Sequence, residues 1–296
     1  GTLIILESTV APGTTRDFLV PLIQKNSRID MTELDIVFSP ERIDPLNKKW
    51  NLKNTPKIVA GLTLKSRKKA IEFYSKFIDN LIECETLEVA ETAKLLENSF
   101  RLINISFINE VSIFCQKLGI DVNAVISSAS TKPYGFMPFY PSIGIGGHCI
   151  PVDPLYLTWW ARQNGEIAEF VAKADSINRA MPKYVAHRAL AMVDSSIKIP
   201  KILILGVAYK PGVGDVRETP VTALRSHLQD LGANVAWHDP LVPEWDGSNP
   251  VDLNWICDVA ILATNQPCMH LDKFITRGIQ ILDCTNSILG IKHVTS

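Results

Sequence analysis

Cys149 is the residue of this chain whose surroundings most strongly suggest chemistry. It lies in the run Gly-Ile-Gly-Gly-His-Cys-Ile-Pro-Val-Asp-Pro, residues 144–154. Glycines let the backbone take unusual angles and let a ligand come close. A thiolate in such a polar loop, four residues before the acid Asp153, could act as a nucleophile. A structural thiol in a Gly-rich turn is the alternative that spacing alone leaves open.

Three further polar residues could assist such a nucleophile. Lys94 and Asn98 are four residues apart and therefore share one face of a predicted helix. Both could donate hydrogen bonds to a developing oxyanion; a solvated lysine beside a polar neighbour is the commoner alternative. Glu41 follows the predicted end of a strand, where open α/β sheets bind ligands. Its carboxylate could orient water or act as a base, although the residues alone favour an ordinary acid in a surface loop.

A second Gly-rich segment, residues 206–220, joins a predicted strand to a predicted helix. Its glycines, with Lys210 and Arg217, suit a phosphate-bearing ligand at the helix N-terminus. The segment matches neither Gly-x-Gly-x-x-Gly nor the P-loop, so by itself it is a weak indication of nucleotide binding.

The elements that position these residues alternate between strand and helix. Strands are predicted at 3–6, 35–38, 57–60, 201–207, 234–237, 259–263 and 280–282, and helices at 15–25, 66–78, 155–164, 167–194 and 220–231. This order predicts an α/β protein with two Rossmann-like doubly wound domains, the first of them incomplete, joined by a long central helix. The expected domains are 1–84, 85–195 and 196–296.

The long helix is predicted from residues 87–118, which contain no proline or glycine. Apolar residues recur there at alternating spacings of four and three: Val89, Ala93, Leu96, Phe100, Ile103, Phe107 and Val111. They form one face of a helix that Gly119 ends. This face is either a subunit interface, giving a homodimer, or the side of a central core helix. Residues 131–154, rich in proline, glycine and aromatic side chains, instead predict an ordered loop built around a ligand.

Composition narrows the class of protein. The chain has 296 residues, 46% hydrophobic and 21% charged, with a net charge of −1. This balance favours a globular protein and gives no case for a nucleic-acid or membrane partner. No apolar run reaches the roughly 20 residues that span a bilayer, and no secretory signal is present. The chain opens on a strand pattern at Gly1 without a methionine, as if it began inside a domain.

The six cysteines contain no Cys-x-x-Cys pair, which argues against a zinc ribbon or a dithiol redox site, and no metal is expected. Because they are far apart in a chain long enough to bury a core, no disulfide framework is needed. We therefore expect a reducing, cytoplasmic compartment. The five cysteines other than Cys149 are predicted to be small core residues.

Together these motifs resemble the UDP-glucose/GDP-mannose dehydrogenase family. The matching residues occur in one order along nearly the whole chain: Ser8-Thr9-Val10, Ser39-Pro40-Glu41-Arg42, Lys94 with Asn98, Gly146-Gly147-His148-Cys149 with Asp153, and Tyr209-Lys210 through Asp215 and Arg217. The variants at 41–45, 54–57 and 131–141 look like the branch acting on UDP-N-acetylglucosamine.

The resemblance implies a four-electron oxidation of the C6 alcohol of a UDP-sugar to a carboxylate, with NAD as the cofactor. Cys149 would be the nucleophile that forms a thiohemiacetal and then a thioester. Lys94 and Asn98 would stabilise oxyanionic intermediates, and Asp153 and Glu41 would assist proton transfer and position water.

The resemblance also assigns binding residues. Ser8, Thr9 and Arg217 would contact NAD. The UDP-sugar would be held by Glu41, Arg42, Lys94, Asn98, Tyr140, Gly144, Gly146, Tyr209 and Lys210.

The sequence departs from the family pattern in three places. The opening strand and Gly-rich dinucleotide turn are not in the sequence, so the chain is expected to be N-terminally truncated and to bind NAD poorly by itself. Residues 283–286, Asp-Cys-Thr-Asn, stand where some relatives carry an arginine that contacts substrate, and Ser142-Ile143 replaces a Pro-Gly pattern. UDP-glucose or UDP-N-acetylmannosamine remain alternative substrates. A truncated, non-catalytic homologue that binds a nucleotide sugar or a partner is the remaining alternative.

Overall fold

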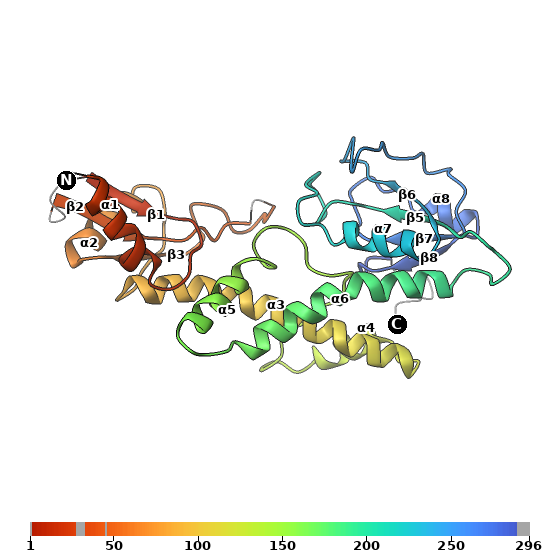
Figure 1. Cartoon of the computed structure of the whole chain (residues 1–296), viewed down its shortest axis with the longest axis horizontal. Helices are drawn as coiled ribbons and strands as arrows, with labels where there is room; N and C mark the ends of the chain where they lie inside the picture. The colour runs from red at the N-terminus through yellow and green to blue at the C-terminus, as the bar shows by residue number, and fades with distance from the viewer. Residues whose placement is uncertain (1, 28–32, 45, 289–296) are drawn as a thin grey trace. The chain divides into compact units, whose positions relative to one another are not determined.

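The computed structural model describes residues 2–27, 33–44 and 46–288. Gly1 and Pro45, on which sequence predictions fall, lie outside the described residues. The chain divides into two compact units: Gly1–Phe100 with Val152–Glu169, and Arg101–Pro151 with Phe170–Ser296 (Figure 1). Because this boundary falls inside the predicted domain 85–195, the three-domain division stays a prediction.

The first unit is built on a four-stranded sheet. Its strands, in spatial order, are β1 (Thr2–Leu6), β2 (Leu34–Phe38), β3 (Lys57–Gly61) and β4 (Leu81–Glu83). The pairs β1–β2 and β3–β4 are parallel, and β2–β3 is antiparallel. The helical elements between the strands are η1 (Thr14–Leu19), α1 (Val20–Asn26) and α2 (Leu64–Tyr74).

Both faces of this sheet are covered. Successive residues of a strand point to opposite faces, and Val37 packs with Ala70 and Tyr74 of α2. Its neighbour Phe38 packs on the other side with Leu87, at the start of the long helix. Burial on both faces explains why β2 is apolar along most of its length and fully buried.

The second unit contains an all-parallel sheet in the order β6-β5-β7-β8. Its strands are β5 (Lys201–Leu205), β6 (Asn234–His238), β7 (Val259–Leu262) and β8 (Gln280–Asp283), with helices α7 (Val221–Asp230) and α8 (Asp272–Thr276). Ile202 and Ile204 face the cluster that contains α7, and Leu203 and Leu205 face the cluster that contains α8. The predicted α/β fold with Rossmann-like domains is confirmed.

The remaining helices are α3 (Leu87–Lys117), α4 (Val122–Ala129), α5 (Asp153–Gln163) and α6 (Glu169–Ala191). The extent of α3 matches the prediction closely, but its predicted apolar face is packed only in part: Ala93 and Val111 lie against core clusters. Leu96 is 64% exposed and Phe107 is 60% exposed, whereas Leu95 and Leu102 are fully buried. The most buried face is therefore a different one, and the large apolar residues of the predicted stripe, Val89, Leu96, Phe100 and Phe107, are exposed on the single chain.

Some local predictions are wrong. Cys268 is exposed at a positive φ of 70° and is not a core residue. Helix α7 begins at Val221, with Pro220 as its N-cap, one residue later than the predicted start at 220. The sequence also gave no signal for β4, α4 and α8. Within the described residues, no helix is long and apolar enough to cross a bilayer.

Candidate functional site

The predicted site residues fall in both units. The first unit holds Ser8, Thr9, Glu41, Arg42, Lys94, Asn98 and Asp153, and the second holds Tyr140, Gly144, Gly146, Cys149, Tyr209, Lys210 and Arg217.

Two predicted catalytic residues of the first unit are in direct contact. Asn98 of α3 donates its Nδ2 hydrogen to Oδ2 of Asp153 at 2.5 Å. Both side chains are almost fully buried, at 7% and 5% exposure. Asp153 opens α5 and is followed by Pro154, so its carboxylate lies at a helix N-terminus, which favours negative charge. Local sequence fixes the start of α5, and packing brings Asn98 to it across 55 positions.

Lys94 lies one turn before Asn98 on α3 and is half-buried. Among the residues that the structure describes, its ammonium has no hydrogen-bond or ion-pair partner. Three donors and a positive charge are thus available to an oxyanion of a ligand.

The loop that carries Glu41 and Arg42 is held at several points. The Glu41 amide donates to Glu7 O at 3.2 Å, which continues the pairing of β1 with β2. The Glu41 Oε1 atom accepts hydrogen bonds from the backbone amides of Arg42 and Ile43 at 2.6 and 2.7 Å. The Arg42 guanidinium in turn contacts Glu97 of α3 at 2.7 Å. The Glu41 carboxylate is therefore oriented by its own loop, while half of its side chain stays exposed.

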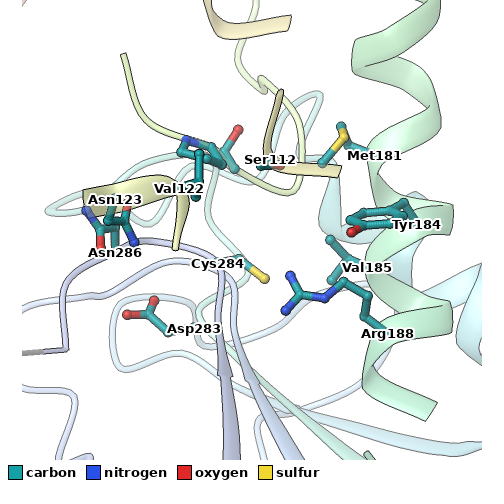
Figure 2. A pocket seen from close by; sticks show the side chains of 12 residues that line it. Ser112, Val122, Asn123, Met181, Tyr184, Val185, Arg188, Asp283, Cys284 and Asn286 are labelled. Atoms are coloured by element: carbon teal, nitrogen blue, oxygen red, sulfur yellow. The ribbon is translucent and has the colours of Figure 1, made fainter. Parts of the chain in front are cut away.

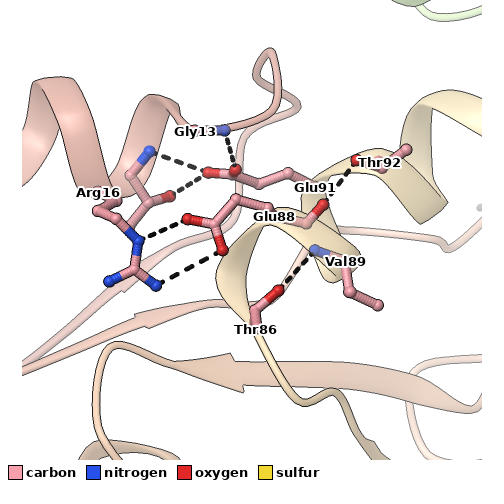
Figure 3. Close-up of polar contacts among 8 residues, drawn as sticks. Gly13, Arg16, Thr86, Glu88, Val89, Glu91 and Thr92 are labelled. Carbon is pink, nitrogen blue, oxygen red and sulfur yellow. Dashed lines mark hydrogen bonds and ion pairs between the residues drawn. The ribbon is translucent and has the colours of Figure 1, made fainter.

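The turn after β1, which carries Ser8 and Thr9, is anchored to α3 through a buried carboxylate (Figure 3). Glu91 accepts hydrogen bonds from the Gly13 amide at 2.6 Å and from the Thr15 amide and hydroxyl at 2.9 and 2.6 Å. Burial of Glu91 raises the pKa of its carboxyl despite these hydrogen bonds. Ser8 is exposed and Thr9 is half-buried, so both hydroxyls can reach a ligand.

In the second unit, the Gly-rich loop lies against the segment that follows β5. A Cβ atom on Gly146 would lie 2.8 Å from Pro220 Cδ and 2.9 Å from Tyr209 Cβ. Gly147 has a φ of +82°, and a Cβ there would lie 2.9 Å from Tyr209 Cε2. These glycines are needed because the backbone of the loop passes directly over the Tyr209 side chain. Cys149, two residues further on, is exposed.

Gly144 and Tyr140 lie at the start of the same loop. The loop is fixed there by Asn178 of α6, whose Oδ1 accepts from the Ile145 amide at 2.7 Å. Gly144 has a φ of +122°, and a Cβ atom on it would lie 3.2 Å from the Asn178 carbonyl oxygen. Tyr140 is 47% exposed.

Charged residues gather beside this loop. The Arg217 guanidinium donates to Asp215 at 2.6 Å and holds the pKa of that carboxyl low, at about 2. His148 lies close enough to Asp215 to act on it electrostatically. The Lys210 ammonium lies 5.6 Å from the centre of the Tyr209 ring. The structure thus brings the Gly-rich loop together with the predicted phosphate-binding segment.

The second unit also contains a pocket that the sequence did not predict (Figure 2). Arg188 and Tyr184 project into it from α6, and Cys284 faces them from the end of β8 (Figure 2). Burial raises the pKa of the Cys284 thiol to about 12, so this cysteine is not a nucleophile at neutral pH. Pro141 and Ser142 connect the pocket to the Gly-rich loop.

Sequence reasoning assigned no role to Arg188, Glu91 or Lys57. Arg188 and Glu91 lie within long helices, where the pattern gives no sign that a charged residue points inward. Lys57 offered the clearer signal, because it directly precedes the buried run Ile-Val-Ala of β3.

Models of one protein family match three segments of the chain. The NAD-binding domain of the UDP-glucose/GDP-mannose dehydrogenase family matches residues 1–78, its central domain matches 88–180 and its UDP-binding domain matches 203–270.

Individual relatives agree with this match. A UDP-N-acetyl-D-glucosamine 6-dehydrogenase of Salmonella typhi is 35% identical over 82% of this chain and 58% of its own length. A UDP-N-acetyl-D-mannosamine dehydrogenase of Methanococcus maripaludis is 34% identical over 81% of this chain and 53% of its own length. The solved structure of a UDP-D-ManNAc dehydrogenase from Pyrococcus horikoshii superimposes with a TM-score of 0.85 at 27% identity, covering 99% of this chain and 72% of that one. The chain thus spans a little over half the length of these curated relatives.

Proposed function

Because this chain belongs to the UDP-glucose/GDP-mannose dehydrogenase family, we propose that the protein oxidises the C6 alcohol of a UDP-sugar to a carboxylate. The observation that carries the proposal is the buried contact of Asn98 with Asp153, beside a lysine with open donors on the same helix. Such a constellation suits the stabilisation of a developing oxyanion and the transfer of a proton.

The chain's residues fit NAD as the cofactor. The segment that matches the family's NAD-binding domain contains the turn after β1, where Ser8 and Thr9 offer hydroxyl groups. Arg217 in the second unit would contribute a charged contact. When bound, NAD would supply the hydride acceptor for each of the two oxidations.

Cys149 would carry the covalent chemistry. Its thiolate would add to the C6 aldehyde as a thiohemiacetal, and the second oxidation would leave a thioester. Lys94 and Asn98 would stabilise the oxyanions of both intermediates. Asp153 and Glu41 would move protons and position the water that releases the carboxylate.

The nucleotide would be held by residues of both Gly-rich segments. The Lys210 ammonium suits a diphosphate, and Tyr209 packs against the Gly-rich loop at Gly146 and Gly147, next to Gly144. Tyr140, and Arg42 of the first unit, would complete the contacts to the UDP-sugar.

The substrate that we propose is a UDP-N-acetylhexosamine. Relatives of nearly equal identity are named for UDP-N-acetyl-D-glucosamine and for UDP-N-acetyl-D-mannosamine. UDP-N-acetylglucosamine is our preferred candidate because the variants at residues 54–57 and 131–141 resemble that branch.

An assay of NADH production by the full-length protein with each UDP-sugar tests the proposal. We expect two NADH for each molecule of preferred sugar. A yield of one would contradict the thioester route, and no NADH with any UDP-sugar would favour the non-catalytic alternative.

The Cys149→Ser variant tests the nucleophile directly. A hydroxyl at that position is a far weaker nucleophile at neutral pH than a thiolate, so we expect turnover to fall at least about a hundredfold while UDP-sugar binding is retained. Stopped-flow absorbance of NADH and calorimetric binding separate these outcomes. Unchanged turnover would remove Cys149 from its proposed role.

We also propose that α3 forms a homodimer interface. Its apolar stripe is exposed, and beside it lies an open groove of about 1050 Å³ lined by Gly13, Val89, Leu96 and Trp160, among others. At 31 residues the helix is about 45 Å long, enough for a stable interface. A second copy of the same helix is the occupant that an apolar stripe along this length fits best.

A further inference from the structure

Lys57 is a buried lysine to which the proposed mechanism assigns no role. It opens β3, and only 7% of its side chain is exposed. A buried ammonium is costly unless it is paired and hydrogen-bonded. Its Nζ atom lies 3.0 Å from Glu7 Oε1, 3.4 Å from the Pro40 carbonyl oxygen and 3.8 Å from Glu41 Oε2.

The Glu7 carboxylate also accepts a hydrogen bond from another residue, Tyr74. The Tyr74 hydroxyl donates to Glu7 Oε1 at 2.6 Å, and the Lys57 ammonium lies 5.1 Å from the centre of the Tyr74 ring. Burial alone would raise the pKa of Glu7, but the hydrogen bonds from Tyr74 and Lys57 outweigh burial and hold that pKa below its ordinary value. Glu7, Lys57 and Tyr74 therefore form a fixed support at the carboxyl end of β1.

Glu41 contacts this group of residues through only one of its two carboxylate oxygens. Its Oε1 atom is occupied by two backbone amides, while Oε2 faces Lys57. A small pocket is lined by Glu41, Lys57 and Thr55, among others. The Thr55 hydroxyl is buried and has no hydrogen-bond partner among the residues described. The pocket has room for about one water molecule, which could bond to this hydroxyl next to the Glu41 carboxylate.

We propose that Lys57 is a positioning residue for Glu41, and that its buried ammonium aims the Glu41 carboxylate so that it activates the water that cleaves the Cys149 thioester. This inference rests on the proposed function. It assigns Lys57 to the hydrolytic step alone, since its Nζ atom is covered by Glu7, Pro40 and Glu41 and only a small part of the side chain is exposed.

The test compares Lys57→Met with Lys57→Arg in the full-length protein. After mixing with UDP-sugar and NAD, quenched samples are analysed by intact-mass spectrometry for the acyl adduct on Cys149. We expect Lys57→Met to lengthen the lifetime of the adduct about three- to tenfold with little change in KM, and Lys57→Arg to restore it. The effect is moderate because Glu41 is half-exposed and solvent screens the pair.

Two further variants separate positioning from plain stability. Tyr74→Phe disturbs the same support without changing its charge, so it should lower the thermal midpoint and leave the adduct lifetime unchanged. In the double variant Glu41→Gln/Lys57→Met, the adduct should live no longer than in Glu41→Gln alone, because Lys57 acts through Glu41.

Each outcome decides a separate claim. The inference would be overturned if the adduct lived equally long in Lys57→Met and in the unmodified protein. It would also be overturned if Lys57→Met and Lys57→Arg lengthened the adduct lifetime equally. If Lys57→Met does not fold, Lys57→Gln replaces it in the same comparison with Glu41→Gln: additive effects on the adduct lifetime would refute positioning. If no adduct forms even in Glu41→Gln, the thioester route of the proposed function fails instead.

Discussion

At the scale of single residues, some glycines are required only by a left-handed backbone angle, and others also by a close contact with a neighbouring side chain. Gly147 and Gly165 both adopt left-handed angles, with φ of +82° and +78°. A side chain on Gly165 would meet nothing within 4 Å, whereas one on Gly147 would strike the Tyr209 ring at 2.9 Å. The pair therefore distinguishes backbone strain from the close approach of the loop to Tyr209.

We predict that Gly147→Ala and Gly165→Ala lose similar amounts of stability but differ in catalytic activity. Each should lose about 1–2 kcal/mol of unfolding free energy through the left-handed angle. Gly147→Ala must also displace Tyr209, so we expect kcat/KM to fall at least about tenfold in that variant only. Urea unfolding and steady-state kinetics of the full-length protein measure both quantities. Equal kinetic losses in the two variants would show that the contact with Tyr209 is not needed.

At the scale of elements, the first turns of α3 fix the turn after β1. Glu91 is fully buried and makes three hydrogen bonds to Gly13 and Thr15, while Glu88 pairs with Arg16 at the surface (Figure 3). Helix α3 thus contacts this turn through two glutamates, of which Glu91 is buried and Glu88 is exposed. The buried contact holds the backbone at Gly13 and Thr15, in the same turn as Ser8 and Thr9.

We predict that Glu91→Gln lowers the unfolding free energy by about 1–3 kcal/mol, because an amide cannot accept all three hydrogen bonds. Glu88→Gln, the matched control, should cost less than about 1 kcal/mol, since its ion pair is solvent-exposed. Hydrogen exchange of residues 10–19 should increase only in Glu91→Gln. Protection that is equal in both variants would rule out Glu91 as the anchor.

The same residue should make stability depend on pH. Burial raises the pKa of folded Glu91 above its ordinary value of 4.5. A raised pKa in the folded protein means that protonation of Glu91 stabilises the fold. This contribution to the free energy of unfolding is fully present below the pKa that Glu91 has in the unfolded chain. It is lost as the pH rises through the pKa of Glu91 in the folded protein. The advantage of the unmodified protein over Glu91→Gln in thermal midpoint should narrow from pH 4.5 upward. A gap that widens with pH would contradict the raised pKa.

At the scale of the whole molecule, the exposed stripe of α3 is the feature that a single chain leaves unexplained. Leu96, Phe107 and Phe114 are 64%, 60% and 54% exposed on one helix. Isolated apolar residues on a surface are ordinary, and it is their arrangement in a row along one helix that supports the proposed homodimer interface.

We predict that Phe107→Glu converts the full-length protein from dimer to monomer, because a carboxylate would be buried without a partner at the interface. Ile256→Glu is the control, since Ile256 is 71% exposed but lies outside α3. Sedimentation velocity gives the oligomeric state of both variants. A dimer that survives Phe107→Glu unchanged would place the interface elsewhere.

The sequence alone determined the alternation of strands and helices, the extent of α3 and the residues that match the family, because hydrophobic period and turn residues are local properties. It could not show that β2 and β3 run antiparallel, since β2 and β3 read alike from sequence in either direction. It also could not show which face of α3 is buried, that Asn98 meets Asp153, or that Lys57 lies beside Glu41. These are contacts between residues far apart in the chain. Only the tertiary structure decides them, because they depend on how the elements pack and not on the period of any one of them.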